Sequence, residues 1–188
     1  MEFKTRRLIL KVLDKSYADV VLDYNLRNRQ FLSEWGSLED EDFYSLKKHK
    51  IILSHDTNPI KKLELLRLWI FKKSDNSFDR TIGSVCFSNI IRQNFRSCFL
   101  GYKLDKDEIN KGYMTEAIEK GIDIMFNEYK IHRIEANVMP KNKRSLKVLE
   151  KAGFENEGLS KKYLEINGKW EDHIHMVILN DTLERNEV

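Results

Sequence analysis

The chain has 188 residues, of which 41% are hydrophobic and 34% charged, and its formal net charge is +3 at pH 7. This length suits one domain with one sizeable core, and the balance of residues is that of a globular protein. So small a positive charge does not by itself indicate a nucleic-acid-binding protein. No apolar run approaches the roughly 20 residues of a membrane-spanning helix. The N-terminal segment shows no signal-peptide cleavage site, so we expect a cytoplasmic protein.

The first part of the chain predicts a strand followed by two helices. Residues 6–13 (RRLILKVL) have the leucine and β-branched content of a strand. Asp14 or Ser16 then stands where a helix cap is expected. Ser37 and Asp40 resemble a capping box, so we expect a second helix to begin there.

The rest of the chain alternates strands with helices. The helix after Gly112 carries apolar residues at a spacing that makes a buried stripe, and Gly153 ends a shorter helix that begins near Asn142. Asn167-Gly168 is the preferred pair for a type I′ hairpin turn, and alternating strands flank it. These signals predict an α+β protein with a mixed, mainly antiparallel sheet. The expected strands are residues 65–73, 80–90, 97–104, 132–139, 161–166 and 169–179.

The stretch DEINKGYMTEA places a short polar turn with Asn110, Lys111 and Gly112 at the start of the long helix. The first N–H groups of a helix lack internal partners and lie at the positive end of its dipole. Such a turn can therefore hold a phosphate, with Lys111 adding a point charge. The alternative is a plain cap, in which Asn110 closes the helix and Gly112 lets the backbone approach closely. Neither a P-loop nor a G-x-G-x-x-G motif is present, which disfavours an NTPase or a dinucleotide oxidoreductase.

Several ordered motifs together resemble the GNAT acetyltransferase family, and within it the RimJ/RimL-like branch of ribosomal-protein N-acetyltransferases. They are TRRLILK, RNRQFLSEW, GYKLDKDEINKGYMTEA, HRIEANVMPKNKRSLKVLEKAGF and the NG hairpin, and the similarity spans about Thr5–Asn180. The family signature Q/R-x-x-G-x-G/A falls on Ile109–Met114, where Gly112 alone is kept. Asn110 stands where glycine is usual, and asparagine tolerates left-handed backbone angles.

The implied fold is a single GNAT domain over residues 1–188, with a core of about 5–180. In this α+β fold a twisted, mainly antiparallel mixed sheet is flanked by helices, and two central strands, here 97–104 and 132–139, splay apart. The resemblance implies that acetyl-CoA is the cosubstrate and that its thioester lies in the gap. A bulge near Gly101-Tyr102 is expected to aim one N–H at the acetyl carbonyl and so stabilise the oxyanion.

The resemblance also implies which residues bind acetyl-CoA. The backbone of Tyr102, Lys103 and Leu104 is expected to pair with the pantetheine arm as if it were an added strand. Asn137 and Asn142 are expected near pantetheine or the thiol end. The amides of the turn and the first helical residues are expected to grip the pyrophosphate: Asn110, Lys111, Gly112, Tyr113, Met114 and Thr115.

The implied reaction is direct attack of a neutral amine on the thioester, which requires a base for the amine and an acid for the departing thiolate. In the RimJ/RimL-like branch the serine of N-x-x-S can sit beside the CoA sulfur, so Ser145 is the expected acid. The alternative is that Asn142 caps a helix and Ser145 lies in its first turn for stability alone. Glu135 is the expected base, acting with Asn137 to order a water, and the alternative is an ordinary solvent-facing glutamate. Glu165 and Asp172, which flank the hairpin turn, are the other candidates for the base.

The histidines and cysteines do not predict a metal site. His173 and His175 lie on the same strand face, but no third ligand is apparent. Cys86 and Cys98 have no metal-site spacing and sit in apolar runs, so we expect free, buried thiols.

The resulting hypothesis is an acetyl-CoA-dependent N-acetyltransferase that acts on an amine. The branch implies a protein N-terminal α-amine, with a ribosomal protein as one candidate partner, and no membrane. A monomer and a homodimer are both open. The alternatives are a small-molecule N-acetyltransferase for polyamines or antibiotics, because one scaffold serves many acceptors, and a non-catalytic module that binds CoA or the ribosome.

Overall fold

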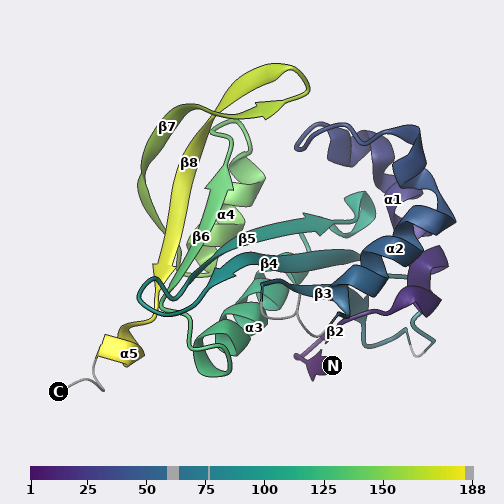
Figure 1. Ribbon diagram of the computed structural model, residues 1–188, viewed down its shortest axis with the longest axis horizontal. Helices are drawn as coiled ribbons and strands as arrows, with labels where there is room; N and C mark the ends of the chain where they lie inside the picture. Colours follow the sequence, from purple (N-terminus) through teal and green to yellow (C-terminus); the bar gives the residue numbers. More distant parts are fainter. Residues whose placement is uncertain (59–63, 76, 185–188) are drawn as a thin grey trace.

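The computed structural model describes residues 1–58, 64–75 and 77–184, and its main feature is one eight-stranded sheet in the order β1-β2-β3-β4-β5-β6-β8-β7 (Figure 1). All neighbouring strands are antiparallel except β5 and β6, which are parallel. No helix within these residues is both long and apolar enough to span a membrane. The strands are β1 (Glu2–Lys4), β2 (Leu8–Lys11), β3 (Leu66–Lys72), β4 (Gly83–Ile91), β5 (Ser97–Leu104), β6 (Arg133–Val138), β7 (Glu155–Ile166) and β8 (Lys169–Leu179).

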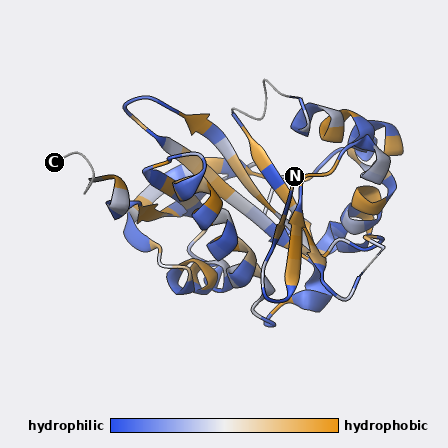
Figure 2. Cartoon of the chain, turned by 90° about the horizontal axis from the view of Figure 1, so that it is seen from below, coloured by the Kyte–Doolittle hydropathy of each residue, from blue (hydrophilic) through white to orange (hydrophobic). Residues whose placement is uncertain are grey.

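Helices cover both faces of the sheet (Figures 1 and 2). Side chains alternate along β3, so that Leu68 and Ile70 join the larger core cluster, beneath α3 and α4, while Trp69 and Phe71 join a smaller cluster beneath α1 and α2. The expected α+β fold with a mixed, mainly antiparallel sheet is confirmed. The helices are η1 (Lys15–Tyr17), α1 (Ala18–Ser33), η2 (Glu41–Tyr44), α2 (Leu46–Asp56), η4 (Lys106–Glu108), α3 (Tyr113–Asn127), α4 (Lys143–Lys151) and α5 (Asp181–Glu184).

The two central strands splay apart as predicted. Strand β5 pairs with β6 at Ser97–Phe99, opposite Arg133–Glu135, and the pairing stops there. Beyond that point β5 continues along β4, and β6 continues along β8 (Figure 1). The expected bulge near Gly101-Tyr102 is wrong, because the β4–β5 register is unbroken from Gly83 to Ser88 and shifts only between Ser88 and Ile91.

The start of the second helix also differs from the prediction. Asp40 does accept a hydrogen bond from the N–H of Phe43, at 2.8 Å, but it caps only the short 3-10 helix η2. The backbone then extends at Ser45, whose hydroxyl caps α2 by accepting from the N–H of Lys48. Two competing local caps therefore break what the sequence pattern presents as one helix. Similarly, Asp14 caps the short helix η1 rather than α1 itself.

The hairpin turn has the predicted geometry. Asn167 and Gly168 have φ values of 52° and 79°, and a type I′ turn requires positive φ at both central residues. The hairpin reaches the segment after α1, because the Asn167 side chain accepts from the N–H of Leu38 at 2.6 Å and donates to the carbonyls of Ser33 and Gly36. The β7–β8 hairpin, on one side of the split sheet, is thus hydrogen-bonded to the end of α1 and the segment after it, on the other side.

Candidate active site

The helix α3 begins with open backbone amides. Its N-cap is Gly112, with φ of 75° and no side-chain cap hydrogen bond within the described part of the chain. Asn110 is also left-handed, with φ of 61°, as its place in the signature suggests. By contrast, Ser45 caps α2 and Asn142 caps α4 with their side chains. The first-turn amides of α3 are therefore available to an anionic ligand.

Side chains from outside the turn hold it in place. Arg7 donates to the carbonyl of Lys111 at 2.9 Å and forms an ion pair with Glu116 at 2.7 Å. The ammonium of Lys111 contacts Glu108 at 2.9 Å and the carbonyl of Asp107 at 2.6 Å. The side chain of Lys111 is thus engaged with its own turn, and the point charge that it would supply to a ligand stays a prediction.

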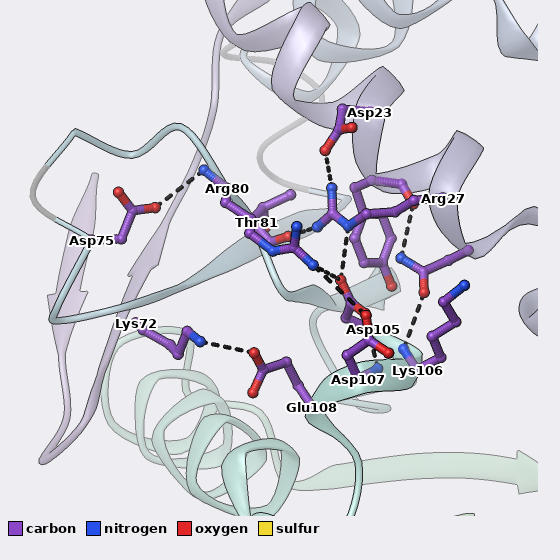
Figure 3. A network of polar contacts seen from close by, with 12 residues as sticks. Asp23, Arg27, Lys72, Asp75, Arg80, Thr81, Asp105, Lys106, Asp107 and Glu108 are labelled. Atoms are coloured by element: carbon purple, nitrogen blue, oxygen red, sulfur yellow. Dashed lines mark hydrogen bonds and ion pairs between the residues drawn. The ribbon is translucent and has the colours of Figure 1, made fainter.

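A buried ionic network fixes the segment between β5 and α3. Figure 3 shows Arg27 and Arg80 converging on Asp105, and Lys72 reaching Glu108. Asp105 is fully buried, and its carboxylate lies 2.8 Å from Nε of Arg27. Burial alone would raise the pKa of Asp105, but hydrogen bonds from the backbone and from Arg27 outweigh it, so the pKa is lowered. Helix α1 and strand β3 therefore position the start of α3.

A groove of about 480 Å³ lies between β5, the open turn and α4. Its lining includes Tyr102, Lys103, Leu104, Asn110, Gly112, Met114, Thr115, Asn142 and Ser145, all predicted cofactor-binding or catalytic residues. Tyr113 and Lys111 do not line it, and the ring of Tyr113 instead packs beneath Arg7, 4.6 Å from the guanidinium.

Four basic side chains of α4 also line this groove: Lys143, Arg144, Lys147 and Lys151. The sequence groups Lys143 and Arg144 in a basic cluster with Lys130, His132, Arg133 and Lys141, which predicts either a contact with the CoA 3′-phosphate or a ribosomal surface, or a solvated face. Lys147 and Lys151 are not part of that prediction. None of the four has a carboxylate within 4 Å among the residues that the structure describes. The four-residue spacing of Lys143, Lys147 and Lys151 is the signal that would have placed them on one helix face.

A second cavity, of about 530 Å³, opens on the α1–α2 side of the sheet. Its lining includes Gly101 on β5 and residues 136–139 on and after β6, so it reaches the splay. Several lining side chains carry buried polar atoms without a hydrogen-bond partner in the described structure. They are Oη of Tyr24, both ring nitrogens of His49, Nε1 of Trp69 and Oδ1 of Asn137.

The two cavities meet at the splay. Tyr102 and Ser145 lie at this junction, and their hydroxyl oxygens are 2.6 Å apart. Asn142 caps α4 by accepting from the N–H of Ser145 at 3.1 Å, as the alternative interpretation of that residue predicted. Burial raises the pKa of Tyr102 to about 12, so its phenol is protonated at neutral pH. The residues that line both cavities are Trp35, Tyr102, Lys103, Asn142 and Ser145.

The β5 backbone also faces this junction. The N–H of Asp105 donates to the carbonyl of Ile82 at 2.8 Å, and the regular β4–β5 register continues from there. Alternation along an antiparallel strand therefore points the N–H of Tyr102 away from β4 and into the gap. A regular strand thus presents the donor for which a bulge was expected.

Glu135 is not brought to either cavity. It lies opposite Phe99, in the part of β6 that still pairs with β5, and its carboxylate contacts Arg133 at 2.8 Å. His173, in contrast, lines the second cavity, and its Nδ1 is 3.1 Å from the carbonyl of Glu171. A carbonyl only accepts, so Nδ1 carries the hydrogen and the neutral ring keeps a lone pair on Nε2. The alternation of side chains along β8 predicted which strand face His173 occupies, but it did not predict that His173 lines a cavity.

Histidines and cysteines form no metal site in the described residues, where no group of three potential ligands gathers. His175 contacts the hydroxyl of Ser160 at 2.7 Å. Both cysteines are free, as expected. Cys98 is buried, but Cys86 is only half-buried and lines the second cavity.

The basic groove with the open start of α3 suits an anionic donor. The second cavity meets this groove where the sheet splits, and it gives a separate place to an acceptor. This arrangement is that of a transferase. A family model described as an acetyltransferase (GNAT) domain matches residues 7–155, and the chain belongs to this family of N-acetyltransferases.

Individual relatives agree with this assignment. A probable N-acetyltransferase, YjcK of Bacillus subtilis, is 39% identical over 94% of this chain and 96% of the relative. The ribosomal-protein-S5-alanine acetyltransferase of Vibrio fischeri has a similar structure, with a TM-score of 0.89, 34% identity and coverage of 96% of this chain and 97% of that chain. RimJ of Mycobacterium smegmatis, solved in complex with CoA-disulfide, has a TM-score of 0.84 and 27% identity, and the match covers 94% of this chain and 83% of that chain.

Proposed function

We propose that this protein transfers the acetyl group of acetyl-CoA to the α-amino group of a protein N-terminus. The observation that carries the proposal is the junction of the two cavities at Tyr102 and Ser145. A donor in the groove and an acceptor in the second cavity can meet there without displacing each other. Bringing two reactants into contact in a fixed orientation supplies a large part of the rate enhancement of a transferase.

The groove residues fit the donor. The open amides of α3 suit the diphosphate of CoA, and the basic face of α4 suits its phosphates. Gly112 has φ of 75°, a left-handed conformation that glycine adopts without strain, and its lack of a Cβ leaves the backbone open to a ligand. The unpaired edge of β5 then offers backbone groups to the pantetheine arm, as a strand offers them to a peptide.

The residues at the junction suit the transfer step. The N–H of Tyr102 faces the gap and is placed to stabilise the oxyanion. Ser145 gives a proton to the departing sulfur. An α-amine has a pKa of about 8, so roughly a tenth of it is neutral at pH 7 and a weak base suffices. We assign that base to His173, through its lone pair on Nε2, in place of Glu135, whose carboxylate is held by Arg133.

The charges of the acceptor cavity favour a peptide over a polyamine. Two cationic side chains, Arg67 and Lys103, line it, against a single carboxylate from Glu39 among the described residues. A polyamine carries several positive charges that this lining does not balance. The Vibrio fischeri relative is named for acetylating an alanine of ribosomal protein S5, which makes an alanine-initiated peptide the first acceptor to test.

The test is a thiol-release assay with acetyl-CoA and matched acceptors. One peptide begins with a free alanine and contains an internal lysine, and its control is the same peptide with a blocked N-terminus. We expect thiol release with the free peptide only, and fragmentation mass spectrometry should place one acetyl group on the α-nitrogen. Acetylation of the internal lysine or of spermidine, without the α-amine, would contradict the proposal. Binding of CoA without turnover of any amine would instead indicate a non-catalytic module.

A further inference from the structure

The hydroxyl of Tyr102 makes two contacts with one residue. It lies 2.6 Å from Oγ of Ser145 and 3.1 Å from the carbonyl oxygen of the same serine. Tyr102 is on β5 and Ser145 is in the first turn of α4, so the contact bridges the two elements between which the groove and the second cavity meet. No pattern in the sequence linked these two side chains.

The hydroxyl hydrogens can be arranged in two ways. If Tyr102 donates to the serine carbonyl, the serine hydroxyl is free to donate back to the phenol oxygen, and its hydrogen is turned away from the groove. If Tyr102 donates to Oγ, the hydrogen of the serine hydroxyl points away from the phenol. It can then point into the groove, because Ser145 lines the groove. The 2.6 Å contact is present in both arrangements. A thioester sulfur bound in the groove selects the second, because only then does the serine hydrogen point at the sulfur while the phenol still donates to Oγ.

We propose that Tyr102 is a positioning residue for the transfer step: its phenol donates to Oγ of Ser145 and so directs the serine hydrogen toward the sulfur of the donor. This inference rests on the proposed role of Ser145 as the acid. The half-buried phenol keeps its proton, because burial raises its pKa to about 12. It can therefore act as a donor throughout the physiological pH range.

The proton balance closes within the junction. Attack by the neutral amine forms the N–C bond and leaves one proton too many on nitrogen. When the C–S bond breaks, its electron pair goes to sulfur, and the sulfur takes the hydrogen of Oγ. Oγ is stabilised at that moment by the hydrogen bond from Tyr102. Oγ then regains a proton that came from the nitrogen, so both hydroxyls end as they began.

A double-mutant cycle tests the inference. Tyr102→Phe removes only the phenol oxygen, and Ser145→Ala removes its partner. We expect either variant to lower kcat by about tenfold to a hundredfold, as for loss of a hydrogen bond to a charged group, with the KM for acetyl-CoA nearly unchanged. The double variant should be no slower than Ser145→Ala alone. Tyr129→Phe, which removes the phenol oxygen of a residue that lines neither cavity, is the matched control and should retain wild-type kcat.

A second measurement, proton NMR, does not depend on turnover. A hydroxyl hydrogen in a short O–H···O bond gives a downfield proton resonance, and we expect one in the free wild type and in Tyr129→Phe. It should be absent from both Tyr102→Phe and Ser145→Ala. Losses of kcat that multiply in the double variant would overturn the inference while leaving Ser145 as the acid. Wild-type turnover of Ser145→Ala would overturn that acid role, and the inference with it.

Discussion

Gly112→Ala tests whether the open turn at α3 binds the donor. Gly112 has φ of 75°, and a residue with a side chain pays about 1–2 kcal/mol in this left-handed region. The new Cβ would lie 3.3 Å from Nη2 of Arg7, the end of a flexible side chain that can shift by a few tenths of an ångström. We therefore expect a loss of about 1–2 kcal/mol in the free energy of unfolding, or roughly 2–8 °C in Tm.

The loss in the free energy of CoA binding should be larger than this loss in the free energy of unfolding. The same Arg7 holds the carbonyl of Lys111, so its displacement disturbs the amides that we propose bind the diphosphate. Loss of charge-assisted hydrogen bonds typically costs about 1.5–3 kcal/mol, which predicts a CoA affinity about 10-fold to 100-fold weaker in calorimetry.

Gly153→Ala is the matched control for this experiment. Gly153 follows α4 with φ of 89°, and its added Cβ would meet Ile178 at 3.5 Å, an ordinary contact. It lines neither cavity. The control should lose similar stability and bind CoA as the wild type does. Equal CoA affinities for Gly112→Ala and Gly153→Ala would refute the assignment of the diphosphate to this turn.

Three further predictions concern other parts of the site. The double variant Lys147→Ala/Lys151→Ala should weaken CoA binding about tenfold at low salt and less at high salt, because exposed charges are screened; calorimetry showing the same loss at both would contradict this. The lowered pKa of Asp105 stabilises the fold above the unfolded-state pKa, and that stability is lost as pH falls through the folded pKa. Asp105→Asn should therefore lower stability at pH 7 and flatten its decline below about pH 4, measured by urea unfolding. An unchanged slope would show that folding does not lower the pKa of Asp105. Asn167→Ala removes the contact between the hairpin and the segment after α1, so it should raise the KM for the acceptor peptide and leave that for acetyl-CoA unchanged; equal changes in both would contradict a local effect.

Local signals predicted the fold well where a short segment determines its own conformation. Strand β5 occupies the predicted residues 97–104, and Asn167-Gly168 forms the predicted turn. Asn110 adopts the left-handed angle that its place in the signature suggested. These features depend on side-chain pattern and backbone sterics within a few residues, which a sequence displays directly.

The acceptor side could not be predicted in the same way, because it depends on where strand pairing stops. Glu135 and Asn137 lie on the same face of β6, yet the pairing with β5 ends at Glu135. Asn137 therefore lines the cavity, whereas Glu135 does not. Tyr24 and His49 join the cavity from α1 and α2, and only the packing of these helices on the sheet brings them there.

Helix capping shows why structural and functional interpretations of one residue do not exclude each other. Asn142 caps α4 through Oδ1, and a side chain held in this way has one fixed position while it lines both cavities. The cap thus preorganises Asn142 for binding at no further entropic cost. At α3 the opposite holds, because Gly112 offers no side chain and the first-turn amides stay open. Helix α4, whose N-terminal side chains line the groove, has a side-chain cap, whereas α3, whose first amides lie at the groove, has none. This difference follows from the groups that each helix start presents to the groove.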